Sequence, residues 1–259
     1  MGSLVSAVNR AVEFAALYKH LYLTTQLRRK AQAFHQRHSG RCAVIIGNGP
    51  SVDIDLLPKL NDAVTFACNR FHLCYPQTTF RPDYTVIVDN QMMADFGDDI
   101  HRQADSPVFS GDLALAQSHE QGYYVPLSCL KAFSFADLKQ RGYLHPGDCV
   151  VVAAIQLAYL MGIRNIFLYG VDHSFAFQHS SELTDGRVTG ESNHFIDNYR
   201  DGRPWYPPNT AVIEDAFSQC SKYIQRHGGQ LVNLTPNTQL DQVPKGDVQH
   251  FISSGYESF

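Results

Sequence analysis

The 259-residue sequence has few charged residues and lacks any long apolar run. Charged residues make up 18% of the chain and hydrophobic residues 44%, a balance typical of a folded globular protein rather than a disordered one. No stretch approaches the roughly 18 uncharged apolar residues of a membrane-spanning helix, and the N-terminus shows no secretory signal pattern. We therefore expect a cytoplasmic protein with one large domain or two small ones.

Paired cysteines and the common nucleotide-binding motifs are also missing. The six cysteines contain no CxxC pair, so neither a zinc site nor a disulfide framework is expected. Neither GxGxxG nor GxxxxGK[ST] occurs, which disfavours hydride-transfer dehydrogenases and P-loop NTPases. The net charge of -4 argues against nucleic acid as the main partner.

Charge is unevenly distributed along the chain. Residues 1–40 carry six Lys and Arg against one Glu, which gives this segment a charge of +5 and leaves -9 on the remainder. Apolar residues recur at helical spacing within it, so we predict a basic helical extension. This extension either docks on the following domain or makes peripheral contact with the anionic inner face of a membrane.

From residue 41 onward, apolar strands alternate with helical segments. We predict strands at 42–46, 63–67, 84–88, 165–169 and 230–234, shorter ones at 107–110 and 123–126, and helices at 149–161 and 210–227. This order indicates an α/β, Rossmann-like domain over 41–259, with a mostly parallel sheet flanked by helices. The polar, aperiodic stretch 173–210 is predicted to form a lid.

The predicted strands end in residues that can bind a ligand at one edge of the sheet. Gly47 and Gly49 are expected to bring backbone amides to a phosphate, with added hydrogen bonds from Asn48 and Ser51, unless this is an ordinary tight turn. Further candidate nucleotide-binding residues are Asn69, Arg70, Asp89, Asn90, Gly170, His173 and Asn237.

Two aspartates at strand ends have a second interpretation. Asp89 and Asp172 could hold Mg²⁺ or orient a ribose. Asp53 and Asp55 resemble the DxD metal motif, but their place after the glycine turn favours helix capping. Asp172 is also a candidate catalytic residue.

Within the predicted lid, His194 is the candidate general base. Histidine is suited to take a proton from a hydroxyl near neutral pH when a carboxylate holds its tautomer. Tyr199, Trp205 and Tyr206 either stack on a base or sugar or pin the loop.

Five segments, taken together in this order, resemble two related families. They are Ile-Ile-Gly-Asn-Gly-Pro-Ser (45–51), Ala-Cys-Asn-Arg-Phe (67–71), Gly-Ile-Arg-Asn-Ile-Phe-Leu-Tyr-Gly-Val-Asp (162–172), Ser-Asn-His-Phe (192–195) and Leu-Thr-Pro-Asn-Thr (234–238). One family is the bacterial sialyltransferases of glycosyltransferase family 42. The other is the family of proteins similar to the 6-hydroxymethylpterin diphosphokinase MptE.

The sialyltransferase resemblance implies a CMP-sugar donor and no metal. It implies that Asn48, Ser51 and Asn69 lie near the nucleotide, Asn90 lies near the donor, and His194 acts as the base. This chain has Cys149-Val150-Val151 where that family has Thr-Ser-Gly. The tyrosine pair that would hold the leaving phosphate falls near Ser174 and the Ser180 region.

The diphosphokinase resemblance implies transfer of diphosphate from ATP with Mg²⁺. It is carried by 81–89 and 194–199. The leading hypothesis is therefore a nucleotide-dependent transferase acting as a glycosyltransferase, with a nucleotide-activated donor and a glycan acceptor in cell-surface glycan synthesis. The alternatives are the diphosphokinase, with Asp89 and Asp172 on the metal, and a non-catalytic nucleotide-binding scaffold.

Overall fold

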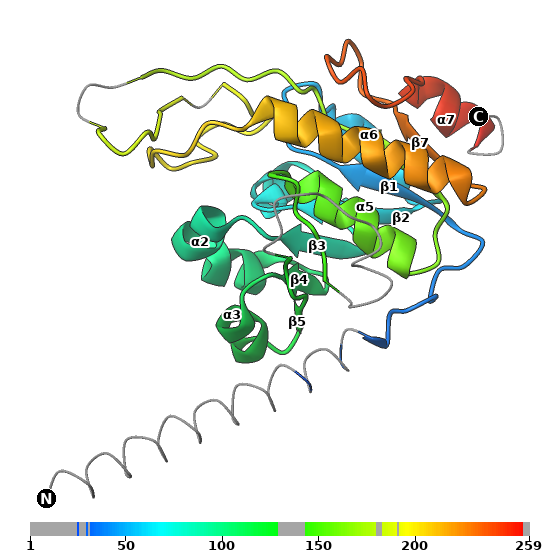
Figure 1. The fold of residues 1–259 in the computed structure, drawn as a ribbon, viewed down its shortest axis with the longest axis horizontal. Helices are drawn as coiled ribbons and strands as arrows, with labels where there is room; N and C mark the ends of the chain where they lie inside the picture. Colours follow the sequence, from blue (N-terminus) through cyan, green and yellow to red (C-terminus); the bar gives the residue numbers. More distant parts are fainter. Residues whose placement is uncertain are drawn as a thin grey trace, which may run out of the picture.

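The computed structural model describes residues 25, 30, 32–128, 143–179, 183–190 and 192–255, in which seven parallel strands form one sheet (Figure 1). The strands are β1 (Cys42–Ile46), β2 (Val64–Cys68), β3 (Tyr84–Ile87), β4 (Val108–Ser110), β5 (Gly122–Tyr124), β6 (Asn165–Tyr169) and β7 (Gln230–Asn233). Their order across the sheet is β5-β4-β3-β2-β1-β6-β7. This confirms the predicted α/β, Rossmann-like class.

Strand β1 lies at the point where the strand order reverses. Ala43 pairs with Val64 of β2 on one side and with Ile166 of β6 on the other. All five residues of β1 are buried, which explains why its sequence is continuously apolar rather than alternating. In open parallel sheets, ligands bind at the carboxyl ends of the strands beside such a reversal, here between β1 and β6.

Helices cover both faces of the sheet. Helices α5 (Val150–Leu160) and α6 (Thr210–Arg226) lie side by side across one face (Figure 1). Nearly every residue of α5 is buried, so this helix is apolar all round, whereas α6 buries only one stripe. The other face is covered by the 3-10 helices η1 (Ile54–Leu60) and η2 (Phe71–Gln77) and by α7 (Val248–Ser254).

Two helices beside β3 and β4 were not predicted from the sequence. Helix α2 (Asn90–Gln103) begins directly after Asp89, whose Oδ1 accepts a hydrogen bond of 2.6 Å from the amide of Met92. Helix α3 (Leu113–Ser118) is capped in the same way by Asp112. Asp89 is therefore an N-cap as well as a strand-end residue.

The described part of the predicted extension packs on the domain. The ring of Phe34 forms T-shaped, edge-to-face contacts with those of Tyr84 and Tyr123, and the Gln36 amide donates to the Leu160 carbonyl. The helical pattern predicted earlier in the extension, through residue 24, lies outside the described residues. Among the residues described, no helix is both long enough and apolar enough to cross a membrane.

The segment predicted as a lid is anchored to α2. Arg200 Nη2 lies 3.0 Å from Asp95 Oδ2, and Arg203 Nη1 lies 3.3 Å from Asp95 Oδ1. Gln91 Nε2 donates to the Pro204 carbonyl at 2.6 Å. These contacts hold residues 199–205 beside the carboxyl end of the sheet.

Candidate functional site

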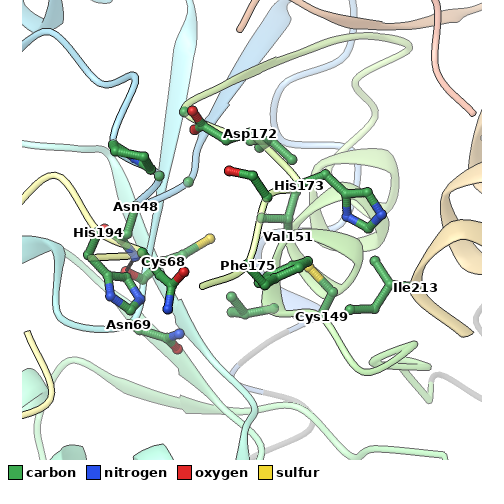
Figure 2. Close-up of a pocket in the computed structure, with 18 of the residues that line it drawn as sticks. Asn48, Cys68, Asn69, Cys149, Val151, Asp172, His173, Phe175, His194 and Ile213 are labelled. Carbon is green, nitrogen blue, oxygen red and sulfur yellow. Dashed lines mark hydrogen bonds between the residues drawn. The ribbon is translucent and has the colours of Figure 1, made fainter. Parts of the chain in front are cut away.

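A pocket opens at the carboxyl ends of β1, β2 and β6, where the strand order reverses (Figure 2). Most of the residues predicted from the sequence to bind a nucleotide or to act in catalysis meet there. The predicted residues that line this first pocket are Gly47, Asn48, Gly49, Asn69, Gly170, Asp172, His173 and His194.

The two glycines of the β1 turn allow close packing of strand ends. The Gly47 amide donates to the Tyr169 carbonyl at 2.8 Å, and the Gly49 amide donates to the Gly170 carbonyl at 3.0 Å. A Cβ added at Gly49 would lie 1.9 Å from Asp172 Oδ2. Both amides are thus already used within the protein, and the expectation that they point at a phosphate is corrected.

One side of the pocket carries buried polar atoms that lack a partner. Asn48 Nδ2 donates to the Cys68 carbonyl at 2.8 Å, which fixes the amide orientation and leaves Asn48 Oδ1 as the free atom. Asn69 Oδ1 and His194 Nδ1 are likewise buried without a hydrogen bond within the described residues. Buried polar atoms are normally satisfied, so these three atoms are candidate partners for a ligand, and the two amide oxygens can only accept hydrogen bonds.

Within the described residues, His194 stacks on an aromatic ring, and no carboxylate pairs with it. Its ring lies on that of Tyr199, with centroids 3.7 Å apart and an interplanar angle of 12°. Burial, with a smaller contribution from the Arg200 charge, lowers the pKa of His194 to about 4. His194 is therefore neutral near pH 7 and can accept a proton there, although it is a weak base in the free protein.

Of the two histidines that line this pocket, His173 is the one that pairs with a carboxylate within the described residues. Its Nε2 lies 3.1 Å from Oε1 of Glu214 on α6, and its ring is turned toward Ile213, away from the polar wall (Figure 2). Sequence analysis missed Glu214 because 41 positions separate the pair and Glu214 looks like an ordinary surface residue of α6. His173 thus joins the lid's first residues to α6.

Asp172 follows β6 and lies against the turn that follows β1. Its Oδ2 accepts a hydrogen bond of 2.7 Å from the Ser51 hydroxyl. Ser51 does not line the first pocket itself, but it orients the Asp172 carboxylate that does. Burial raises the pKa of Asp172 from its ordinary value, while the bonds from Ser51 partly oppose that shift.

The opposite side of the pocket is apolar and includes the start of α5. Cys149, Phe175 and Ile213 stand across from Asn48, Asn69 and His194 (Figure 2). Cys149 is the N-cap of α5 and makes no side-chain capping bond. The N-terminus of this 11-residue helix therefore faces the pocket with its partial positive charge.

A second pocket adjoins the first and contains two of the remaining predicted residues. Asp89 and Asn90 line it, and it shares Cys149 and Val150 with the first pocket. Asp172 lines the first pocket and Asp89 lines the second, so neither of these two pockets holds both carboxylates. Within the described residues, no group of three or more potential metal ligands is found.

Arg70 and Asn237 line neither of these pockets. Arg70 is buried, its Nη1 donates to the Tyr199 carbonyl, and its guanidinium lies 3.9 Å from the centre of the Phe96 ring. Asn237 lies exposed in a turn with φ of 54°. The β7 end reaches the site instead through Thr235, whose hydroxyl oxygen accepts a hydrogen bond from the Val171 amide.

Comparison with solved structures supports the fold. The structure of the MAf glycosyltransferase from Magnetospirillum magneticum AMB-1 superposes with a TM-score of 0.52 at 16% sequence identity. The match covers 88% of this chain and 39% of that chain, so this protein spans well under half the length of the glycosyltransferase. No curated protein matches this sequence.

The family assignment comes from residues 16–177, which match the model of one family. That range contains the β1 turn, the β2 end, the start of α5 and Asp172. It ends before His194 and Tyr199. The chain belongs to the 6-hydroxymethylpterin diphosphokinase MptE-like family.

Proposed function

We propose that this protein is a nucleotide-dependent transferase that transfers a glycosyl unit from a nucleoside-monophosphate-activated sugar, with a CMP-sugar as the first candidate donor. Membership of the MptE-like family supports a transferase. One observation supports the choice of a nucleoside-monophosphate donor: the first pocket has unsatisfied polar atoms on one side and the N-terminus of α5 on the other.

The lining of the first pocket favours a ligand with few phosphates. Among its described lining residues there is no Lys or Arg, and the nearby Arg70 is engaged with Tyr199 and Phe96. The α5 N-terminus supplies roughly half a positive charge, which suits one phosphate better than three. The unpaired oxygens of Asn48 and Asn69 match the hydroxyl or amino groups of a nucleoside.

The proposed reaction is a substitution at the anomeric carbon. The acceptor hydroxyl oxygen forms the new bond to that carbon, while the bond from the carbon to the phosphate oxygen breaks and leaves its electrons on the nucleotide. The N-terminus of α5 stabilises the negative charge of the leaving phosphate. His194 takes the hydroxyl proton, and the bound phosphate raises the pKa of His194 toward neutrality by favouring its charged form.

A thermal-shift panel of CMP, CDP, UDP, GDP, ADP and ATP, each with and without Mg²⁺, tests this proposal first, because a ligand that binds only the folded state raises its stability. Metal-independent stabilisation by CMP is the expected result. With a donor identified, His194→Ala should abolish transfer while it largely keeps nucleotide binding. Equal turnover by that variant would remove His194 from the mechanism.

The family name favours one alternative, a diphosphokinase that uses ATP. In the same panel, stabilisation by ATP that strictly requires Mg²⁺, followed by AMP release, would replace the glycosyl-transfer proposal with this one. Tight nucleotide binding without turnover of any donor would instead support the non-catalytic scaffold.

A further inference from the structure

The second pocket has a lining distinct from that of the first. It has a volume of about 450 Å³, within the range of roughly 300–1,000 Å³ common for small-molecule sites. It lies between the start of α2 at Asp89 and Asn90, the turn before α5 at Asp148, and the lid residue Tyr206. Because the two pockets share Cys149 and Val150, a ligand in one lies next to a ligand in the other.

Of the three lid aromatics that could stack on a base or sugar, Tyr199, Trp205 and Tyr206, only Tyr206 has its ring available. Tyr199 is only 1% exposed and holds the lid, and the ring of Trp205 packs against Phe177 with centroids 6.0 Å apart. Tyr206 is 57% exposed and lines the second pocket. An exposed aromatic face of this kind can stack on the C–H face of a sugar ring.

Hydrogen-bonding groups surround that face. Asn90 and Asp148 are exposed and make no side-chain hydrogen bond within the described part of the chain, and Asp89 uses Oδ1 for the Met92 amide. Amide and carboxylate groups beside an exposed aromatic ring are suited to a ring with several hydroxyl groups.

The charge of the second pocket restricts its ligand. Asp89 and Asp148 both line it, and its described lining contains no Lys, Arg or His. A carboxylate or phosphate on the ligand would meet two full negative charges, against which the shared N-terminus of α5 sets only about half a positive charge.

We propose that the second pocket binds a sugar ring that carries no carboxylate or phosphate, stacked on Tyr206 and hydrogen-bonded by Asn90, Asp89 and Asp148. That this sugar lies next to a bound nucleotide rests on the proposed function. That the second pocket binds a sugar does not depend on it. The ring belongs either to the donor or to the acceptor, and both have the same chemistry here.

Saturation-transfer NMR without nucleotide tests the site directly. The probes are methyl β-D-glucopyranoside, which is neutral, and the methyl α-glycoside of N-acetylneuraminic acid, which is anionic. We expect the neutral glycoside to bind the wild-type protein, and Tyr206→Ala to weaken that binding at least about fivefold, which corresponds to about 1 kcal/mol. Tyr206→Phe should retain it.

Phe175→Ala is the matched control, because Phe175 is an exposed aromatic that lines the first pocket and not the second. It should leave binding of the neutral glycoside unchanged. Loss of binding in Phe175→Ala but not in Tyr206→Ala would place the sugar in the first pocket and overturn the proposal.

The charge argument is tested by Asp89→Asn combined with Asp148→Asn. Asn also serves as an N-cap at position 89 and tolerates the positive φ of 53° at position 148, so the fold should persist. The wild type should prefer the neutral glycoside, and the double variant should reduce that preference at least about fivefold. Equal or tighter wild-type binding of the anionic glycoside would overturn the proposal.

Nucleotide probes then distinguish the two sources of the ring. If Tyr206→Ala weakens binding of UDP-N-acetylglucosamine but not UDP, the ring belongs to a donor activated by a diphosphate, and the monophosphate donor of the proposed function is overturned. If both bind unchanged while the free glycoside is lost, the ring belongs to the acceptor, and either result supports the site. Glycoside binding by a protein that binds no nucleotide would overturn the proposed function and leave the sugar site standing.

Discussion

The imidazole of His194 lies flat on the phenol ring of Tyr199, with 3.7 Å between the ring centroids. The same Tyr199 hydroxyl accepts hydrogen bonds from Asn48 Nδ2 at 3.1 Å and from the Arg70 amide at 3.3 Å. One buried side chain therefore joins the β1 end, the β2 end and the candidate base.

His194 should titrate with a midpoint near pH 4 in NMR spectra of the free protein, because burial and the Arg200 charge disfavour its charged form. Saturating CMP should move this midpoint upward, since a phosphate favours the imidazolium. A midpoint near 6.5 in the free protein would contradict the geometry described above.

The same pKa shift links stability to pH. The unfolded state binds the His194 proton more readily than the folded state, so stability is lost as the pH falls from about 6.5 toward about 4. The contribution is at most about 3 kcal/mol. In denaturant unfolding, His194→Gln should flatten the change of the unfolding free energy with pH in this range. An unchanged pH dependence would show that His194 does not cause it.

Tyr199→Phe should destabilise the protein by about 1–3 kcal/mol, because it removes a buried hydrogen-bond acceptor but keeps the ring stacked on His194. It should also weaken nucleotide binding, since Asn48 loses a partner that positions it. Urea unfolding and titration calorimetry measure the two effects. Tyr206→Phe, at an exposed position, is the control and should change stability by less than about 0.5 kcal/mol.

Gly49→Ala should destabilise the protein strongly, because the new Cβ would lie 1.9 Å from Asp172 Oδ2 and 2.8 Å from the Gly170 carbonyl oxygen. Asp172→Ala in the same chain should recover part of the loss, since it removes the closer of the two clashes. A double-mutant cycle of unfolding free energies measures this coupling. Purely additive effects would show that the β1 and β6 ends are farther apart than described.

Asp95→Asn should cost about 1–3 kcal/mol and make the lid more sensitive to protease, because Asp95 pairs with the buried Arg200 and with Arg203. Denaturant unfolding and limited proteolysis report the two effects. Asp105→Asn is the control: the Arg81–Asp105 pair lies at the surface and should contribute less than about 1 kcal/mol. Similar losses of unfolding free energy in both variants would show that the Asp95 contacts stabilise the protein no more than a surface ion pair.

Helix α2 shows where the sequence analysis stopped short. Met92, Phe96 and Ile100 recur at helical spacing and Asp89 caps the first turn, but Gly97 and several charged residues interrupt the apolar pattern. The sequence therefore places Asp89 and Asn90 at a strand end, as candidate donor-binding or metal-binding residues, and does not predict that a helix begins there. The helix places them instead at a second pocket.

The sequence by itself determined the strands, the sheet class and most of the first pocket. Short continuous apolar runs that end in polar residues and alternate with helical segments favour buried parallel strands, and such strands bring their carboxyl ends to one edge. This pattern predicts that Asn48, Asn69 and Asp172 lie at one edge of the sheet, while His194 joins them only as a lid residue and through the family resemblance.

Only the tertiary structure decided what each group does there. The amides of Gly47 and Gly49 are used in strand packing, Arg70 is turned onto Phe96, and His173 rather than His194 pairs with a carboxylate. These outcomes depend on contacts between segments far apart in the chain, and no local pattern of residues records which long-range partner a side chain meets.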